Sequence, residues 1–212
     1  MMLCGRDDRS YAASMNSQAR TDKRDLILAK GAQVMTRRGY HGTGVLEIVQ
    51  AAGIPKGSFY HYFASKEAFA LQALEHLYGP RLRRYEAALA ERSLRPCERI
   101  LRYYAELLGH FSRQECPENH CFIGSLSFEM AELSQPIGQR VESILRHSIA
   151  ILSNCLEEAR QDGELEPDTD CQALAEFIGN AWEGALLRMK VGRSVAPLTI
   201  FLSQLERLLT TR

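Results

Sequence analysis

The sequence predicts an all-α protein of about nine helices, in which a small three-helix head precedes a larger helical body. Three observations lead to this prediction. Apolar residues recur at helical spacing along most of the 212 residues, and no segment alternates in the way that a strand does. A tight turn at Gly53-Ile54-Pro55 separates two short helical segments. Basic residues gather around that turn, although the chain as a whole has a net charge of zero.

The uneven distribution of charge separates the head from the body. Residues 20–66 hold eight basic and three acidic residues, a net charge of +5, and residues 1–19 are balanced. Residues 67–212 therefore carry a net charge of −5. A basic head on an acidic body is typical of a protein whose head meets nucleic acid while its body has another task. We therefore expect one domain over residues 21–66 and a second over residues 67–212.

The head is expected to begin after a disordered arm. Residues 1–20 are polar and lack periodicity, and either Met1 or Met15 could begin the chain. The first helix is expected over residues 22–38, where apolar residues form one stripe and Gly39 ends the pattern.

The second and third helices surround the tight turn. Thr43 is expected to cap the second helix with its hydroxyl, and Gly53 to end it in a left-handed conformation. Pro55 then opens a very short helix from Lys56 to Phe63. This helix is rich in hydrogen-bonding side chains and poor in core residues. Such a helix suits the major groove of DNA, with its first residues at the base edges.

The body is expected to hold six further helices. They run over residues 66–89 (with a kink at Gly79-Pro80), 96–113, 121–133, 136–162, 170–191 and 197–209. The last two look like a dimer interface, because one carries small residues and the other has more apolar residues than a one-sided surface helix needs. The interface candidates are Gly179, Gly184, Ala185, Phe201, Leu205 and Leu208. The alternative is a helix pair packed within one chain.

Several functional classes find no support in the sequence. No apolar run is long enough for a membrane span or a signal peptide, so we expect a cytoplasmic protein whose six cysteines are thiols. The chain has no GxSxG motif, phosphate-binding loop or dinucleotide-binding glycine pattern. A Cys–His catalytic pair would rest on residue types alone. We therefore expect neither an enzyme nor a cofactor.

The head carries a specific family resemblance. The segment AAGIPKGSFYHYFASKEAF, preceded by RRGYHGTGV, resembles the helix-turn-helix of TetR-type transcriptional repressors over about residues 22–70. The resemblance implies an all-α homodimer that binds a palindromic DNA operator and releases it when the body binds a small effector. In the body, HCFIG and the later WEGA and RMK segments resemble a TetR subgroup that includes repressors answering reactive electrophiles and a regulator answering acrylate.

The resemblance also assigns DNA contacts. It implies that Tyr60 and His61 contact phosphates or bases, and that Thr43 and Lys66 hold the backbone. Lys56 and Ser58 supply further donors suited to phosphate oxygens, and Gly57 allows close approach. The predicted DNA-binding set is Thr43, Lys56, Gly57, Ser58, Tyr60, His61 and Lys66. Tyr62 and Phe63 are expected to pack the head. Arg20, Lys23 and Arg24 either reach the DNA or form a solvated charged run.

Cys121 is the leading candidate for the sensor. It begins a helix, whose positive end lowers the pKa of a thiol, and the subgroup resemblance places a cysteine here. The hypothesis is covalent or redox sensing that leads to DNA release; the alternative is a buried, inert thiol.

Two other sensing mechanisms stay open. A reversible pocket could have walls of Tyr103, Tyr104, Phe122, Phe128, His147, Phe177 and Trp182, with Arg188 as the anchor for a small carboxylate. Cys116, His120 and Cys121 could bind a metal, but they lack an obvious fourth ligand, so no metal site is assigned.

Overall fold

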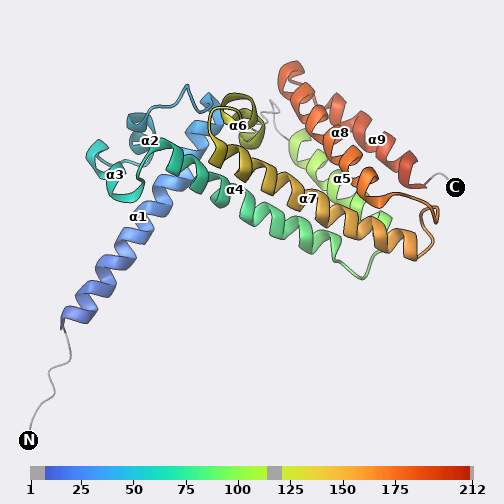
Figure 1. Cartoon of the computed structure of the whole chain (residues 1–212), viewed down its shortest axis with the longest axis horizontal. Coiled ribbons are helices and arrows are strands. Elements are labelled where there is room, and N and C mark those ends of the chain that lie inside the picture. The colour runs from blue at the N-terminus through green and yellow to red at the C-terminus, as the bar shows by residue number, and fades with distance from the viewer. Residues whose placement is uncertain (1–7, 114–120, 211–212) are drawn as a thin grey trace, which may run out of the picture. The chain divides into compact units, whose positions relative to one another are not determined.

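A computed structural model describes residues 8–113 and 121–210, with side chains from Asp22 onward (Figure 1). Within these ranges the chain forms nine α-helices, one short 3-10 helix and no strand, which confirms the all-α prediction. The chain divides into two compact units, Met1–His76 and Leu77–Arg212. No helix in the described ranges has the length and apolar character that a membrane crossing requires.

The first unit holds the predicted helix-turn-helix. Its elements are α1 (Asp8–Arg38), α2 (Val45–Ala51), the 3-10 helix η1 (Lys56–Ser58), α3 (Phe59–Tyr62) and the first part of α4 (Lys66–Leu89). The second unit holds the rest of α4, α5 (Pro96–Ser112), α6 (Phe122–Met130), α7 (Gln135–Gln161), α8 (Cys171–Gly192) and α9 (Ala196–Thr210).

The helix α1 begins earlier than the sequence predicts. It starts at Asp8, so the expected disordered arm is wrong over residues 8–20. No glycine or proline interrupts the chain between Asp8 and Gly31, so nothing in these residues stops the helix from extending toward the N-terminus. The first seven residues of the expected arm lie outside the described part.

Three phenylalanines in tilted and edge-to-face contact form the core of the first unit. The ring centroids of Phe59 and Phe63 lie 5.2 Å apart, and those of Phe63 and Phe69 lie 5.1 Å apart. A Cβ atom added to Gly31 would lie 2.5 Å from Ile48 Cγ2 and 2.8 Å from Phe69 Cζ, so α1 needs a glycine to approach α2 and α4 this closely. Because Phe69 belongs to this core, the compact unit extends past the predicted boundary at residue 66.

The turn before α2 differs from the prediction in its capping residue. Gly44, not Thr43, is the N-cap, and the Glu47 carboxylate accepts a hydrogen bond of 2.8 Å from the Gly44 N–H. The Thr43 hydroxyl is fully buried and donates to the Gly39 carbonyl at 2.8 Å. After α2, Gly53 has a φ of +66°, the left-handed conformation that the sequence predicts there.

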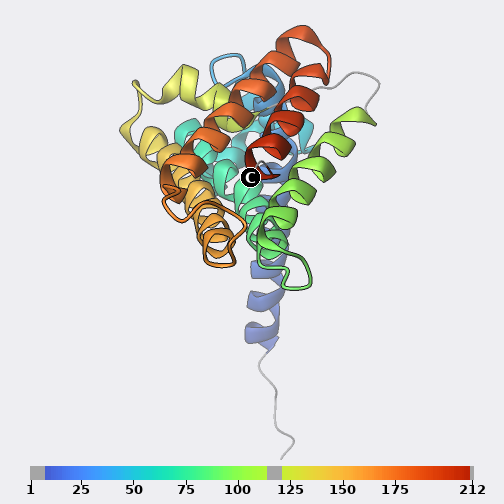
Figure 2. The same ribbon diagram turned by 90° about the vertical axis from the view of Figure 1, so that its right-hand side faces the viewer.

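The second unit is a bundle in which α8 packs against both α7 and α9 (Figure 2). The helix α5 packs on α7 and α9, and α6 packs on α7. The helix α4 is continuous through Pro80, where the sequence predicts a kink. The division between the two units falls within α4, between His76 and Leu77.

The Phe69→Ala substitution should destabilise the first unit. It removes a fully buried ring from the phenylalanine cluster, which costs about 3–5 kcal/mol of unfolding free energy. Urea unfolding followed by circular dichroism measures this loss. Leu46→Ala is the matched control, because Leu46 is 45% exposed and its truncation should cost only about 0.5 kcal/mol. Equal losses in the two variants would contradict this account of the core.

Candidate nucleic-acid interface and sensor site

The short helix η1–α3 presents polar side chains to solvent. Phe59 and Phe63 are buried on one side, and this anchors the helix to the first unit. Lys56, Gly57, Tyr60 and His61 are exposed on the other side and Ser58 is half-buried; Tyr60 is 61% exposed. The arrangement offers cationic, phenolic, hydroxyl and imidazole groups on one narrow surface. These are donors that suit phosphate oxygens and base edges.

Lys66 fastens the start of α4 to the turn between α1 and α2. Its Nζ donates to the carbonyl oxygens of Tyr40 at 3.0 Å and Thr43 at 3.1 Å, and it lies 4.2 Å from the centroid of the Tyr40 ring. Two of the three ammonium protons are therefore used inside the first unit. The Thr43 side chain is fully buried, so the structure offers no exposed hydroxyl there, and the DNA contact of Thr43 stays a prediction. Thr43 and Lys66 support the turn that leads into α2.

The basic residues of α1 differ in their surroundings. The Arg24 guanidinium donates to Gln72 Oε1 at 2.6 Å, so it joins α1 to α4. Lys23 is exposed. The side chain of Arg20 lies outside the described part of the structure. Arg24 therefore has an internal role that the sequence does not reveal.

Cys121 lies at the N-cap of α6, in contact with side chains from α4 and α8. Its sulfur accepts a hydrogen bond of 3.3 Å from the Gly124 N–H, and its thiol donates to Glu183 Oε2 at 3.7 Å. The Tyr78 hydroxyl lies 4.0 Å from the sulfur and accepts a hydrogen bond of 3.0 Å from the Ile123 N–H. Residues from three helices thus meet at one half-buried thiol.

The protonation of this cluster differs from the prediction. Burial raises the pKa of the Cys121 thiol, and the Glu183 carboxylate raises it further. The Gly124 N–H, the Tyr78 hydroxyl and the Arg81 charge act in the opposite direction but are smaller. The expected lowering by the helix end is therefore wrong, because burial and a neighbouring carboxylate outweigh it. Burial also raises the pKa of Glu183 and of Tyr78.

The sequence prediction missed three members of this cluster: Tyr78, Arg81 and Glu183. The Arg81 guanidinium lies 5.0 Å from the centroid of the Tyr78 ring, so it places a positive charge beside the phenol. Glu183 belongs to the WEGA segment that carries the subgroup resemblance, which is the one signal that could have identified it. Tyr78 and Arg81 lie on one face of α4, three residues apart, with no local pattern that indicates a thiol nearby.

The structure divides the other predicted effector residues between the bundle core and the surface, and places only Phe177 and Arg188 along one groove. Tyr104 stacks on Trp182 and on Phe201, with ring centroids 5.0 and 5.1 Å apart, as part of the bundle core. Phe122 is buried in α6. The remaining candidates Phe128, His147, Phe177 and Arg188 are exposed. Arg188 therefore lies away from the thiol, where Arg81 is the nearby arginine, and a pocket with Arg188 as a carboxylate anchor stays a prediction.

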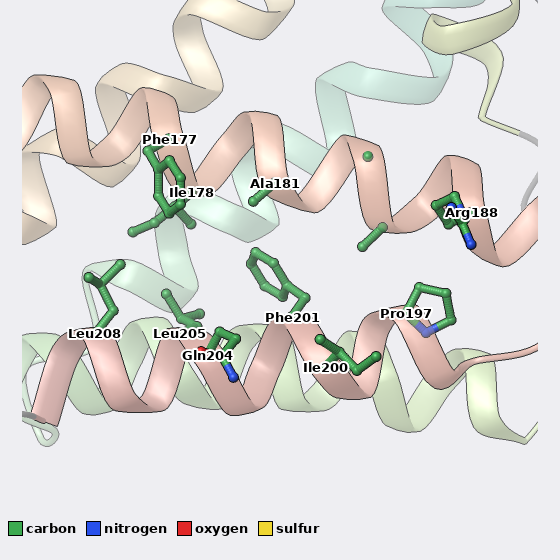
Figure 3. Close-up of a pocket in the computed structure, with 12 residues that line it drawn as sticks. Phe177, Ile178, Ala181, Arg188, Pro197, Ile200, Phe201, Gln204, Leu205 and Leu208 are labelled. Carbon is green, nitrogen blue, oxygen red and sulfur yellow. The ribbon is translucent and has the colours of Figure 1, made fainter.

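An apolar groove of about 580 Å³ runs between α8 and α9 (Figure 3). Its lining includes five of the predicted interface residues: Gly184, Ala185, Phe201, Leu205 and Leu208. Ile200 and Phe177, both 63% exposed, lie along it as well, and Arg188 lies at one end (Figure 3). Gly179 differs, because a Cβ atom there would lie 2.5 Å from Ile149 Cδ1 of α7. Gly179 therefore serves packing within the chain.

The alternative metal site of Cys116, His120 and Cys121 includes two residues that the structure does not describe. Within the described ranges, no group of three or more His, Cys, Asp or Glu side chains could hold a metal ion. Cys116 and His120, which the sequence places beside Cys121, lie outside them. Cys97, Cys155 and Cys171 are free and buried.

Methionine substitutions at Lys66 and Lys56 should distinguish a lysine that stabilises the fold from one that binds DNA. Lys66→Met removes two charge-assisted hydrogen bonds and leaves two carbonyls without this donor, which should cost roughly 1–3 kcal/mol of unfolding free energy. Lys56→Met should change stability by only about 0.5 kcal/mol, because Lys56 is exposed, but should weaken DNA binding. Thermal unfolding and fluorescence anisotropy measure the two effects. Equal stability of both variants would remove the supporting role of Lys66.

Comparison with known proteins identifies the family. Residues 27–73 match the N-terminal domain of bacterial regulatory proteins of the tetR family, and residues 96–205 match the tetracyclin repressor-like C-terminal domain. The HTH-type transcriptional repressor DhaR of Mycobacterium sp. strain GP1 is 35% identical over 87% of this chain and 91% of its own length. NemR, an HTH-type transcriptional repressor of Escherichia coli K12, is 34% identical over 93% of this chain and 98% of its own length.

Solved structures agree with the sequence matches. The crystal structure of E. coli NemR in its reduced form has a TM-score of 0.81, with 34% identity, and covers 90% of this chain and 100% of that chain. The crystal structure of regulatory protein TetR from Rhodobacter sphaeroides has a TM-score of 0.79, with 32% identity. It covers 86% of this chain and 96% of that chain. On the matched domains, the relatives and the fold, the chain belongs to the TetR family of helix-turn-helix transcriptional repressors.

Proposed function

We propose that this repressor releases its operator when an electrophile modifies the thiol of Cys121. The observation that carries the proposal is the contact of this thiol with Tyr78 and Glu183. Tyr78 lies on α4, the helix that begins at Lys66 in the DNA-binding unit. The sensor would thus act on the element that leads directly from the recognition helix.

The DNA-binding state is a homodimer on a palindromic operator in the cytoplasm. Each subunit inserts its η1–α3 helix into the major groove, with Lys56, Ser58, Tyr60 and His61 at the phosphates and base edges. Gly57, which has open space around it, permits close approach of the backbone. The two half-sites lie on one face of the duplex, about 34–36 Å apart or a multiple of that distance.

The groove between α8 and α9 supplies the dimer interface. It is apolar, exposed in the single chain and continuous along both helices. Exposed apolar surface of this kind is typical of a protein–protein contact. The partner subunit would present the same two helices, as a two-fold symmetric contact requires.

Modification of Cys121 would change its contacts with both neighbours. The thiol loses the proton that it donates to Glu183, and the added group needs space beside the Tyr78 hydroxyl. Tyr78 also holds the Ile123 N–H at the first turn of α6, so its displacement would disturb the link between α4 and α6. A coupling free energy of only about 1–3 kcal/mol between this site and DNA binding is sufficient for a regulatory response.

The relatives support a thiol-based response more than the alternatives. NemR, at 34% identity, is described in a reduced form, which is consistent with a protein whose thiol chemistry matters. A reversible carboxylate effector is the second candidate, now with Arg81 as the cation near the site. It predicts operator release without any change in the mass of the protein.

The Cys121→Ser variant tests the proposal. N-ethylmaleimide should abolish the mobility shift of the wild-type protein on DNA flanking its gene, and should leave the shift of Cys121→Ser intact. Cys171→Ser is the matched control, because Cys171 also lies at the start of a helix yet is buried. Its response should equal that of the wild type. Equal release from wild type and Cys121→Ser would refute Cys121 as the sensor.

Ile200→Lys tests the dimer interface. It places a charge in the α8–α9 groove and should convert the dimer to a monomer in analytical ultracentrifugation. Ser203→Lys adds the same charge on the same helix at an exposed position that does not line the groove, and should stay dimeric. A dimer in both variants would place the interface elsewhere.

A further inference from the structure

We infer that Glu183 is the base that takes the proton of Cys121 as its sulfur attacks an electrophile. The inference rests on the proposed function, because it describes how the same thiol becomes reactive. Glu183 would then be part of the sensor chemistry, and not only a neighbour that packs against it.

The geometry assigns this role to Glu183 among the charged groups near the thiol. The thiol donates to Glu183 Oε2 at 3.7 Å, which is within the range of a sulfur hydrogen bond. From α4, the Tyr78 hydroxyl and the Arg81 charge act on the sulfur, and from α5 Tyr104 also feels the charge of Glu183. Tyr78 stays protonated, since burial raises its pKa far above neutrality. A carboxylate is therefore the acceptor that the site offers.

The surroundings of the sulfur suit the negative charge that develops during attack. The Gly124 N–H points at the sulfur from the first turn of α6, at 3.3 Å. The Tyr78 hydroxyl already accepts the Ile123 N–H, so its own proton is available for the sulfur at 4.0 Å. Proton removal by Glu183 and donation by these two groups act on the same atom from different sides.

The reaction with a maleimide is a balanced addition. The Cys121 sulfur forms a bond to one alkene carbon, and the carbon–carbon double bond becomes an enolate. The thiol proton passes to the Glu183 carboxylate, which then returns it to the adjacent carbon. The product is a thioether, Glu183 is regenerated as a carboxylate, and nothing is oxidised or reduced.

A simple electrostatic role for Glu183 predicts the opposite effect of its removal. The negative charge of Glu183 raises the pKa of the thiol, so its loss would increase the thiolate fraction and speed alkylation. If Glu183 is the base, its loss removes the proton acceptor and slows alkylation. The sign of the rate change in Glu183→Gln therefore distinguishes the two roles.

The experiment measures the rate at which N-ethylmaleimide alkylates Cys121, scored on the Cys121 peptide by mass spectrometry. At neutral pH, Glu183→Gln should react roughly 10²-fold more slowly than wild type, the lower part of the range for general base catalysis. Glu176→Gln should react at the wild-type rate, because it makes the same exchange at an exposed position on the same helix. A faster reaction in Glu183→Gln, or an unchanged one, would overturn the inference.

The pH dependence of the rate supplies a second readout. In wild type the rate should rise as Glu183 loses its proton and then level off, because the carboxylate fraction and not the thiolate fraction controls it. In Glu183→Gln the rate should rise about tenfold per pH unit, because only the thiolate then reacts. Should Glu183→Gln fail to fold, Glu183→Asp decides between the roles. If the alkylation rate of Glu183→Asp is lower than that of wild type but still levels off with pH, Glu183 acts as the base. If this rate rises tenfold per pH unit, the base role is refuted.

The outcome is separable from that of the proposed function. Rapid, Glu183-dependent alkylation of Cys121 without release of DNA would contradict the proposed function and leave this inference standing. If DNA release needs Cys121 but is faster in Glu183→Gln than in wild type, the proposed function stands and the inference about Glu183 is refuted.

Discussion

The ammonium group of Lys66 is the contact on which the helix-turn-helix unit depends. It binds two carbonyl oxygens in the turn between α1 and α2, and so ties the first residue of α4 to the entrance of α2. A carbonyl that loses a charged donor at a half-buried site costs stability, so the register of this turn is strongly fixed. The phenylalanine cluster then holds η1–α3 against the same end of α4. The exposed side chains of η1–α3 are consequently held by a packed core.

The surroundings of Cys121 illustrate how burial can outweigh a local electrostatic effect. A helix N-terminus stabilises a nearby negative charge by roughly 0.3–1 kcal/mol, whereas burial can shift a pKa by several units, at 1.36 kcal/mol each. Cys121 experiences both, together with the charge of Glu183, and its pKa is raised. A thiol in this state resists adventitious oxidation better than a free thiolate does. In the proposed mechanism, the reactivity of this thiol comes from Glu183, which takes its proton.

The sequence predicts those features that short-range spacing controls. The left-handed turn at Gly53, the buried Phe63 and the exposed Tyr60 all follow from a few consecutive residues, as does the all-α class. The N-cap was misplaced by one residue, because Thr43 prefers a buried bond to the Gly39 carbonyl over capping α2. The contact between Cys121 and Glu183 joins residues 62 positions apart, and only the packing of α8 near α6 creates it. The same packing, invisible in local patterns, directs Arg188 toward the α8–α9 groove.

The proline within α4 gives that helix an uneven mechanical stiffness. Pro80 has no N–H, so the carbonyl of His76, four residues earlier, lacks its usual partner in the helix ladder. His76 is also the last residue of the first compact unit. The missing hydrogen bond therefore lies at the boundary between the two compact units, and Tyr78 lies within the same turn. A change at Tyr78 would therefore act on α4 in the turn where its hydrogen-bond ladder is incomplete.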